Sequence, residues 1–255
     1  MADAWETFPA QMGDHRAFIA FNGSYAEIAR TDPRTSLFRV RLEFKHPTAE
    51  GMPPEDEFPE LRNVLNLLTT GVVAEGGIHV GRVTAKGYRH FYFYVALPEE
   101  KVLDLFDSVA AQTPYELAYA YQEDPEKDGY WKNLYPTADD WQVIRDIRVL
   151  DALKDKGDIS NVSRPVSHWA YFPTPQEAQQ FADWARTNAY QVDSVAPTGD
   201  KVEVRFTHEA TMELEDITYH TIIINRKTKA LGGDYDGWET SVERSVQPTS
   251  QSRPR

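Results

Sequence analysis

The feature that most constrains the fold is a period of two in the hydrophobic pattern, which recurs in short segments separated by amphipathic helical segments. The segment 37–45 (LFRVRLEFK) alternates apolar and charged side chains, the apolar ones being Phe38, Val40, Leu42 and Phe44. Such alternation is typical of a strand with one buried face. Because a strand cannot bury that face alone, the pattern predicts a sheet that helices cover on one side.

The first half of the chain continues in the order strand, helix, strand, strand, helix, strand. After the strand at 37–45 we expect a helix at 56–69, a hairpin of strands at 78–84 and 88–96, a helix at 99–112 and a strand at 115–122. Extra strand material at 16–21 precedes them and is followed by a turn at Asn22-Gly23. This βαββαβ order is that of a ferredoxin-like domain, an antiparallel sheet with helices on one face.

The second half repeats the order after a leading helix predicted at 139–156. The expected elements are a strand at 164–172, a helix at 174–188, strands at 190–195 and 201–208, a helix at 213–231 and a strand at 234–242. Thr174, Pro175 and Glu177 form a capping box that begins the first of these helices. The run 222–224 (III) is also compatible with a strand. We therefore predict an α+β protein of two ferredoxin-like domains.

The two domains meet in the charged segment 122–138, which contains prolines and a glycine but also Tyr130, Trp131 and Leu134. These side chains are too apolar for a free tether, so we predict an ordered linker. The expected layout is a first domain at 1–138 that includes this linker, a second domain at 139–246 and a disordered tail at 247–255. The tail is polar and contains proline.

Composition excludes several classes of function. The chain has no cysteine, which rules out thiol nucleophiles, disulfides, cysteine-ligated zinc and iron–sulfur clusters. Forty acidic and 27 basic residues leave a net charge of −13, which opposes sequence-independent binding of nucleic acid. No apolar run approaches the roughly 20 residues that cross a bilayer, and the N-terminus lacks a signal pattern. We expect a cytoplasmic protein that binds neither membrane nor, directly, nucleic acid.

The sequence offers no catalytic set and no cofactor motif. His168, His208 and His220 fall on separate predicted elements, and none has the i, i+4 spacing of a helical metal pair. Neither a nucleophile elbow (GxSxG) nor a phosphate-binding loop occurs. We therefore predict no enzyme activity, no cofactor and no metal.

Aromatic and acidic side chains gather on the strands of the second half. The candidate partner-binding residues are Asp158, Trp169, Tyr171, Asp234, Tyr235, Asp236, Trp238 and Glu239. Rings inside an acidic rim suit a basic, partly apolar partner. Both features are needed, because an exposed ion pair contributes only about 0.2–1 kcal/mol and micromolar affinity requires about 8 kcal/mol. A core position for the tryptophans, above all Trp169, is the alternative. The carboxylates of 234–239 could also offer oxygens to a hard cation, but their spacing falls short of a calcium loop.

Two other binding functions remain open at this stage. Tyr88, His90, Tyr92 and Tyr94 share one face of a predicted strand and could stack RNA bases, as in the RNA-recognition strand of the same topology. Arg89 stands where that motif has Gly or Ala. A small-molecule sensor with its ligand between the two domains is a further possibility.

Four segments of the second half have a distinctive sequence, namely 149–153 (VLDAL), 157–158 (GD), 164–172 (RPVSHWAYF) and 232–240 (GGDYDGWET). Through these segments the second half, over about residues 139–246, resembles the RraB family of regulators of ribonuclease E activity. The first half is similar to a domain of unknown function often found upstream of RraB-like domains. Its carriers are 51–53 (GMP), Glu57, Leu61, 80–84 (VGRVT), 87–94 (GYRHFYFY), Trp131 and Tyr135.

The resemblance to RraB implies inhibition without catalysis. Members of that family bind the arginine-rich scaffold region of ribonuclease E and alter how it handles transcripts. We therefore expect an adaptor whose second half binds a basic segment of ribonuclease E, or of a related RNA-processing assembly, and lowers its activity. The motif strings themselves do not identify the residues that contact the nuclease.

Overall fold

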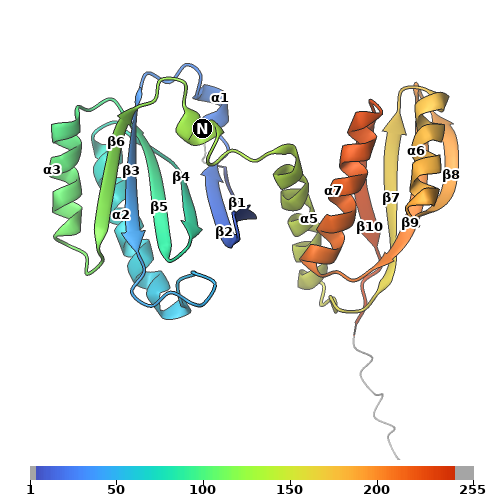
Figure 1. The fold of residues 1–255 in the computed structure, drawn as a ribbon, viewed down its shortest axis with the longest axis horizontal. Helices are drawn as coiled ribbons and strands as arrows, with labels where there is room; N and C mark the ends of the chain where they lie inside the picture. The colour runs from blue at the N-terminus through green and yellow to red at the C-terminus, as the bar shows by residue number, and fades with distance from the viewer. Residues whose placement is uncertain (1–3, 245–255) are drawn as a thin grey trace, which may run out of the picture. The chain divides into compact units, whose positions relative to one another are not determined.

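The computed structural model describes residues 4–244, which divide after Thr137 into two compact units. Each unit consists of one antiparallel sheet with helices between its strands (Figure 1). The prediction of an α+β protein with two ferredoxin-like units is therefore confirmed. The tail predicted at 247–255 lies outside the described residues.

The first unit has a six-stranded sheet with the strand order β1-β2-β4-β5-β3-β6. Its elements are β1 (Trp5–Met12), β2 (His15–Asn22), α1 (Tyr25–Ile28), β3 (Ser36–Glu43), a 3-10 turn η1 (Glu55–Glu57), α2 (Phe58–Ala74), β4 (Ile78–Ala85), β5 (Tyr88–Val95), α3 (Glu99–Ala110), β6 (Leu117–Glu123) and α4 (Asp128–Trp131). The last four strands have the ferredoxin-like order. The hairpin of β1 and β2 extends the sheet beside β4, which matches the extra N-terminal strands expected from the sequence.

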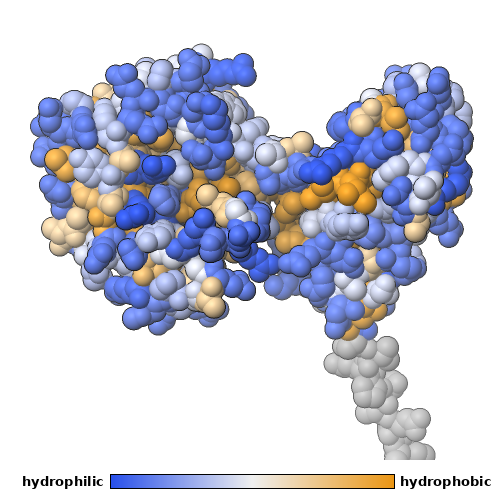
Figure 2. All heavy atoms as spheres, viewed as in Figure 1, coloured by the Kyte–Doolittle hydropathy of each residue, from blue (hydrophilic) through white to orange (hydrophobic). Residues whose placement is uncertain are grey.

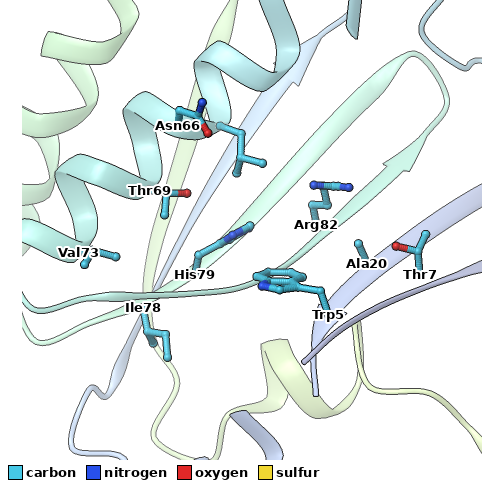
Figure 3. A pocket seen from close by; sticks show the side chains of 10 residues that line it. Trp5, Thr7, Ala20, Asn66, Thr69, Val73, Ile78, His79 and Arg82 are labelled. Atoms are coloured by element: carbon cyan, nitrogen blue, oxygen red, sulfur yellow. The ribbon is translucent and has the colours of Figure 1, made fainter. Parts of the chain in front are cut away.

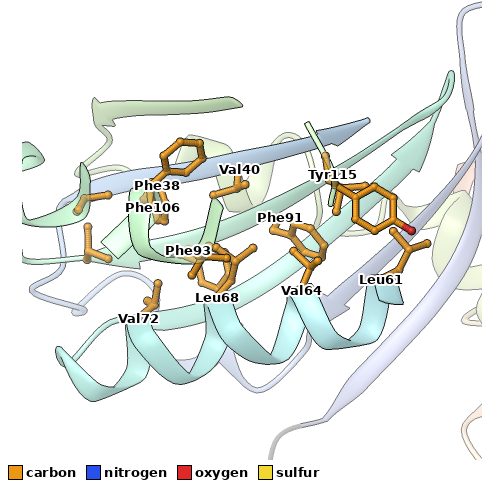
Figure 4. Close-up of a cluster of buried hydrophobic side chains, with 14 of the residues drawn as sticks. Phe38, Val40, Leu61, Val64, Leu68, Val72, Phe91, Phe93, Phe106 and Tyr115 are labelled. Carbon is orange, nitrogen blue, oxygen red and sulfur yellow. The ribbon is translucent and has the colours of Figure 1, made fainter. Parts of the chain in front are cut away.

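Helices α2 and α3 cover one face of this sheet and close a core with β3 and β5 (Figure 4). The inward positions of α2 are Leu61, Val64, Leu68 and Val72, all fully buried, at the three- and four-residue spacing of a helix face. The helix runs to Ala74, beyond the predicted end at residue 69, because this apolar spacing continues through Val72.

The opposite face of the sheet carries the tyrosines considered for RNA stacking, and the structure buries two of them. Tyr94 has no exposed surface, stacks on Tyr25 of α1 and donates a hydrogen bond to Asp124 Oδ2 at 2.6 Å. Tyr130, from the segment that follows β6, packs edge-on against Tyr25. Tyr92 is 5% exposed. A base cannot stack on rings that are already covered, so this part of the RNA hypothesis is wrong.

The second unit has a four-stranded sheet with the order β10-β7-β9-β8. Its elements are α5 (Ala138–Asp155), β7 (Arg164–Phe172), α6 (Pro175–Thr187), β8 (Gln191–Thr198), β9 (Lys201–Ala210), α7 (Leu214–Ala230) and β10 (Asp234–Thr240). Within residues 4–244, no helix is long and apolar enough to cross a membrane.

Local signals explain where the helices of the second unit begin and end. The side chain of Thr174 accepts a hydrogen bond from the Glu177 backbone N–H, and its hydroxyl donates to the Glu177 carboxylate at 2.5 Å, which confirms the predicted capping box. Residues 222–224 are helical rather than extended, because Ile217, Thr221 and Ile224 lie on one buried face of α7. Helices α6 and α7 pack on one face of the sheet, and α5 packs against α7.

Candidate partner-binding face of the second unit

The second unit covers one face of its sheet with helices, and strand β7 shows how side chains divide between the two faces. Val166, His168 and Ala170 point toward the helices and are fully buried. The intervening side chains of Trp169 and Tyr171 point to the opposite face and are partly exposed. The predicted alternation therefore places these two rings on the sheet face that carries no helix of this unit.

Carboxylates outnumber bases on this face. The acidic side chains are Asp193, Glu203, Glu209, Asp234, Asp236 and Glu239, and the basic ones are Lys201 and Arg205. The register against β7, or a hydrogen bond to a neighbour on this face, places these side chains outward. Asp236 lies in the bulge of β10 and is exposed. We call this surface the acidic face.

The two partly exposed rings of the acidic face already contact charged groups of the chain itself. The guanidinium of Arg205 lies 5.2 Å from the centroid of the Trp169 ring, within the range of a cation–π contact. The hydroxyl of Tyr171 donates to Glu203 Oε2 at 3.2 Å. Desolvation, followed by the charges of Glu203 and Asp236, raises the pKa of Tyr171. The Trp169 ring is therefore already in contact with the guanidinium of Arg205, and Tyr171 with the carboxylate of Glu203.

The other two aromatic candidates are core residues, which corrects the sequence-based site. Tyr235 is 6% exposed and Trp238 is 8% exposed. The Trp238 Nε1–H donates to Asp146 Oδ1 at 2.9 Å, inside a buried network in which Thr221 donates to Asp146 Oδ2. Burial raises the pKa of Asp146, while its three hydrogen bonds oppose that rise. Neither Tyr235 nor Trp238 is available to a partner.

A β-bulge explains why both rings point inward. Strict alternation would place residues 235 and 238 on opposite faces of β10. The register shifts between Tyr235 and Gly237, so that Tyr235 pairs with Ala170 and Trp238 pairs with His168, both of which face the helices. Gly237 has a φ of 127°, a backbone conformation that glycine adopts without steric cost.

Two of the candidate carboxylates also have structural partners. Asp158 Oδ2 accepts from Arg164 Nη2 at 2.5 Å, and both side chains are almost completely buried. Asp234 forms ion pairs with Lys201 and Lys229, and these lysines lower its pKa. Asp158 is therefore a structural residue, and Asp234 lies on the acidic face with its charge already paired. Trp169, Tyr171, Asp236 and Glu239 keep accessible positions on that face.

The structure brings together three histidines that the sequence left apart. His168 Nε2 lies 2.9 Å from His208 Nδ1, and the rings of His208 and His220 are 3.9 Å apart. The hydroxyl of Tyr235 lies 2.7 Å from His168 Nδ1, and that of Tyr190 lies 2.8 Å from His220 Nδ1. The available signal was the parity of the strands, because His168 and His208 occupy inward positions of β7 and β9.

Burial controls the titration of this cluster. Desolvation, with the charges of His208 and His220, holds the pKa of His168 well below its ordinary value. Desolvation, together with His220, lowers the pKa of His208 to about 4. The histidines are therefore neutral near pH 7 and act as hydrogen-bonding core groups. Over the described part of the chain, no group of three or more His, Asp or Glu side chains is arranged to hold a metal ion.

The two units, each with the ferredoxin-like strand order and the second with an acidic sheet face, define a two-domain α+β protein. The chain belongs to the family described as Family of unknown function (DUF695), whose model matches residues 3–135. Residues 144–240 match the family model Regulator of ribonuclease activity B. The predicted layout, an unknown domain followed by an RraB-like domain, is confirmed. At the level of the family, the second half is similar to regulators of ribonuclease activity.

Comparisons with individual proteins add little. No curated protein matches the chain. Among solved structures, an unknown protein from Galdieria sulphuraria is similar at 7% identity, with a TM-score of 0.23 over 82% of this chain and 99% of that one. A putative glycine cleavage system transcriptional repressor is similar at 8% identity, with a TM-score of 0.22 over 81% of this chain and 98% of the other. At these TM-scores neither likeness bears on function.

Proposed function

We propose that the protein is a cytoplasmic, non-catalytic regulator. Its second unit binds a basic, arginine-rich segment of ribonuclease E, or of a related RNA-processing assembly, and lowers the activity of that enzyme. The observation that carries the proposal is the excess of carboxylates on a sheet face where the Trp169 ring already contacts a guanidinium. The match of residues 144–240 to a family of ribonuclease regulators supports the choice of partner.

The chemistry of the acidic face suits arginine better than lysine. A planar guanidinium stacks on an indole ring and donates to carboxylates in a fixed fork, whereas an ammonium acts as a hydrated point charge. A cation–π contact contributes about 0.5–1 kcal/mol at an exposed site and about 2 kcal/mol when desolvated. Several such contacts with ion pairs of about 0.2–1 kcal/mol each are needed for micromolar affinity. An extended segment with several arginines meets that requirement.

Competition with RNA offers a physical route to inhibition. Arginine-rich segments bind RNA largely through phosphate charges. Carboxylates of the acidic face that pair with the same guanidiniums remove them from the RNA. The regulator then reduces recruitment of transcripts without touching the catalytic centre of the nuclease.

The binding step is tested with the full chain and a fluorescently labelled synthetic peptide rich in arginine. The double variant D236N/E239Q removes two exposed charges from the acidic face, and we expect its Kd to rise at least fivefold at 50 mM salt. The control D151N/D155N removes two exposed charges from α5 and is expected to bind like the native protein. Native binding should weaken between about 50 and 200 mM salt, because exposed charges are screened.

Two outcomes of this titration would contradict the proposal. Equal loss of affinity in both double variants would mean that only net charge attracts the peptide. Absence of binding by the folded native chain at low salt would contradict the proposal that the second unit binds an arginine-rich segment. A peptide with every arginine replaced by lysine should bind several-fold more weakly if the Trp169 ring contributes.

The inhibition step needs the nuclease itself. We expect the native chain to slow cleavage of a structured transcript by ribonuclease E that retains its arginine-rich region, and to leave a truncated enzyme without that region unaffected. Equal inhibition of both forms would contradict the proposed route.

A further inference from the structure

The first unit contains a groove beside α2 that the regulator family does not explain. Strands β1 and β2 extend the sheet beyond the area that the buried face of α2 covers. One side of α2 therefore faces β4, β2 and β1 across a groove (Figure 3). The largest cavity there has a volume of about 420 Å³ and is lined by Trp5 and Thr7 of β1, Asn66 and Thr69 of α2 and Arg82 of β4. This volume lies in the range of about 300–1,000 Å³ that is typical of small-molecule sites.

Two smaller cavities continue the groove along α2. One, of about 230 Å³, shares Arg82 with the first and adds Phe18, Phe58 and Arg89. The other, of about 260 Å³, is lined by Arg62, Arg82 and Arg89 together with apolar residues of α2. Arg82 lines all three cavities, so the groove converges on this side chain.

Arg82 and Arg89 have no acidic partner. The described residues place no carboxylate within ion-pair distance of either guanidinium, and Arg89 Nε donates only to Thr84 Oγ1 at 3.1 Å. Desolvation lowers the pKa of Arg82, and desolvation together with the charge of Arg82 lowers the pKa of Arg89 to about 10. Two neighbouring, partly buried positive charges without a counter-ion are costly.

Some other basic residues of the same unit do have a counter-ion within the described residues. Arg34 Nε lies 2.8 Å from Asp32 Oδ1, and Lys45 Nζ lies 2.8 Å from Glu60 Oε2. The chain has an excess of acidic residues, yet within residues 4–244 none forms an ion pair with Arg82 or Arg89.

The walls of the groove supply the other half of a ligand site. Several large apolar side chains that would normally be buried remain exposed there, namely Trp5 (39%), Phe18 (39%), Phe58 (46%) and Val73 (54%). Figure 2 shows that hydrophilic residues cover most of the visible surface, with apolar residues in separate patches. Thr69 lines the cavity, and its Oγ1 is buried without a hydrogen-bond partner in residues 4–244.

We propose that this groove binds a small organic anion, with an oxyanion head held by Arg82 and Arg89 and an apolar or aromatic body packed against Trp5 and Phe58. The shared chemistry of such ligands is a carboxylate or a phosphate ester on an apolar body. Arg62 lines one of the smaller cavities and is exposed, so its positive charge also attracts the anion. The first unit is then the ligand-binding half of the chain.

The probe for the test is the fluorescent aromatic sulfonate 1-anilinonaphthalene-8-sulfonate, used with the full chain. Its neutral counterpart N-phenyl-1-naphthylamine has the same rings without the charge. We expect the sulfonate to bind at least tenfold more tightly than the neutral probe. R82Q should raise the Kd of the sulfonate at least tenfold and leave that of the neutral probe within twofold. The control R41Q removes the same charge from an exposed position on the opposite face of the sheet and should bind like the native chain.

A second pair of variants keeps the test valid if R82Q does not fold. Asn66 and Asn63 are both exposed on α2, but only Asn66 lines the cavity. N66D adds a carboxylate that competes with the ligand for Arg82 and should weaken sulfonate binding at least fivefold, whereas N63D should change it less than twofold. Equal effects of N66D and N63D, or equal binding of the sulfonate and the neutral probe by the native chain, would overturn the proposal.

Competition identifies the head group. Phenyl phosphate that displaces the sulfonate indicates a phosphate ester as the natural ligand class, and benzoate that displaces it indicates a carboxylate. Failure of both to displace the sulfonate would overturn the proposal.

Discussion

Replacing Trp238 by phenylalanine tests whether this ring, in the distinctive segment 232–240, is a core residue or a partner-binding residue. The indole N–H donates to Asp146, which is buried, and the ring packs among Leu153, Val166 and Ile217. Loss of a hydrogen bond to a charged group costs about 1.5–3 kcal/mol. The smaller ring leaves space, at about 0.8 kcal/mol per buried methylene-sized group. We expect W238F to lower the free energy of unfolding of the second unit by about 2.5–4 kcal/mol.

The matched variant is W169F on the acidic face. Its ring is only partly buried, and its described charged contact is the cation–π contact with Arg205, which contributes about 0.5–1 kcal/mol at an exposed site. W169F should therefore cost about 1 kcal/mol or less in stability. It should weaken binding of the arginine-rich peptide several-fold, because phenylalanine is a poorer cation–π partner than tryptophan.

Urea denaturation of the full chain measures both variants. Because slopes of about 1–3 kcal/mol/M are typical, W238F should lower the midpoint of the second unit by about 1–4 M. Hydrogen exchange of peptides from β7 and β9 assigns the change to the second unit. Peptide binding by W238F, measured where the variant is folded, should equal that of the native chain. Unchanged stability together with lost binding in W238F would refute the core assignment of this ring.

Three further predictions test the second unit. Lowering the pH from about 6.5 toward 4 should destabilise the second unit, because the histidines bind protons in the unfolded chain but stay neutral in the folded cluster. The loss should reach about 1.4 kcal/mol per pH unit for each such histidine, and less for the partly exposed His208. H208Q should show a flatter pH profile of the unfolding midpoint, and an identical profile would contradict the role of the cluster. D158A should cost about 3–5 kcal/mol by leaving Arg164 buried and unpaired, whereas D151A at an exposed site should change the urea midpoint little. G233A should cost about 1–3 kcal/mol in the same assay, since an added Cβ would lie 2.6 Å from the Phe172 ring and 2.7 Å from a backbone oxygen; an unchanged midpoint would count against this packing.

The last of these predictions bears on the family resemblance. Gly233 has no room for a side chain, Gly237 allows the bulge of β10, and Tyr235 and Trp238 are core residues. Packing and backbone geometry therefore explain these residues of the segment 232–240. Under the proposed function, recognition of a partner would depend on the outward side chains between these positions, Asp236 and Glu239, and on the neighbouring strand.

Local patterns determined much of the architecture. The pattern of residues 164–172 predicted β7 with its observed bounds, while the outward position of Trp169 remained open until the structure showed it. The capping box predicted where α6 begins. These features depend on neighbours two to four residues apart, so the sequence contains the information that determines them.

Only the tertiary structure decided which distant side chains meet. His168, His208 and His220 converge because two strands and a helix pack at one register, and no short motif encodes that register. The bulge at Tyr235–Gly237 turns Trp238 toward the helices, because one extra residue in a strand reverses the sheet face to which every later side chain points. The groove around Arg82 exists because a hairpin from the N-terminus extends the sheet past α2. Contacts of this kind join residues far apart in the chain, and their geometry is set by packing rather than by any local pattern.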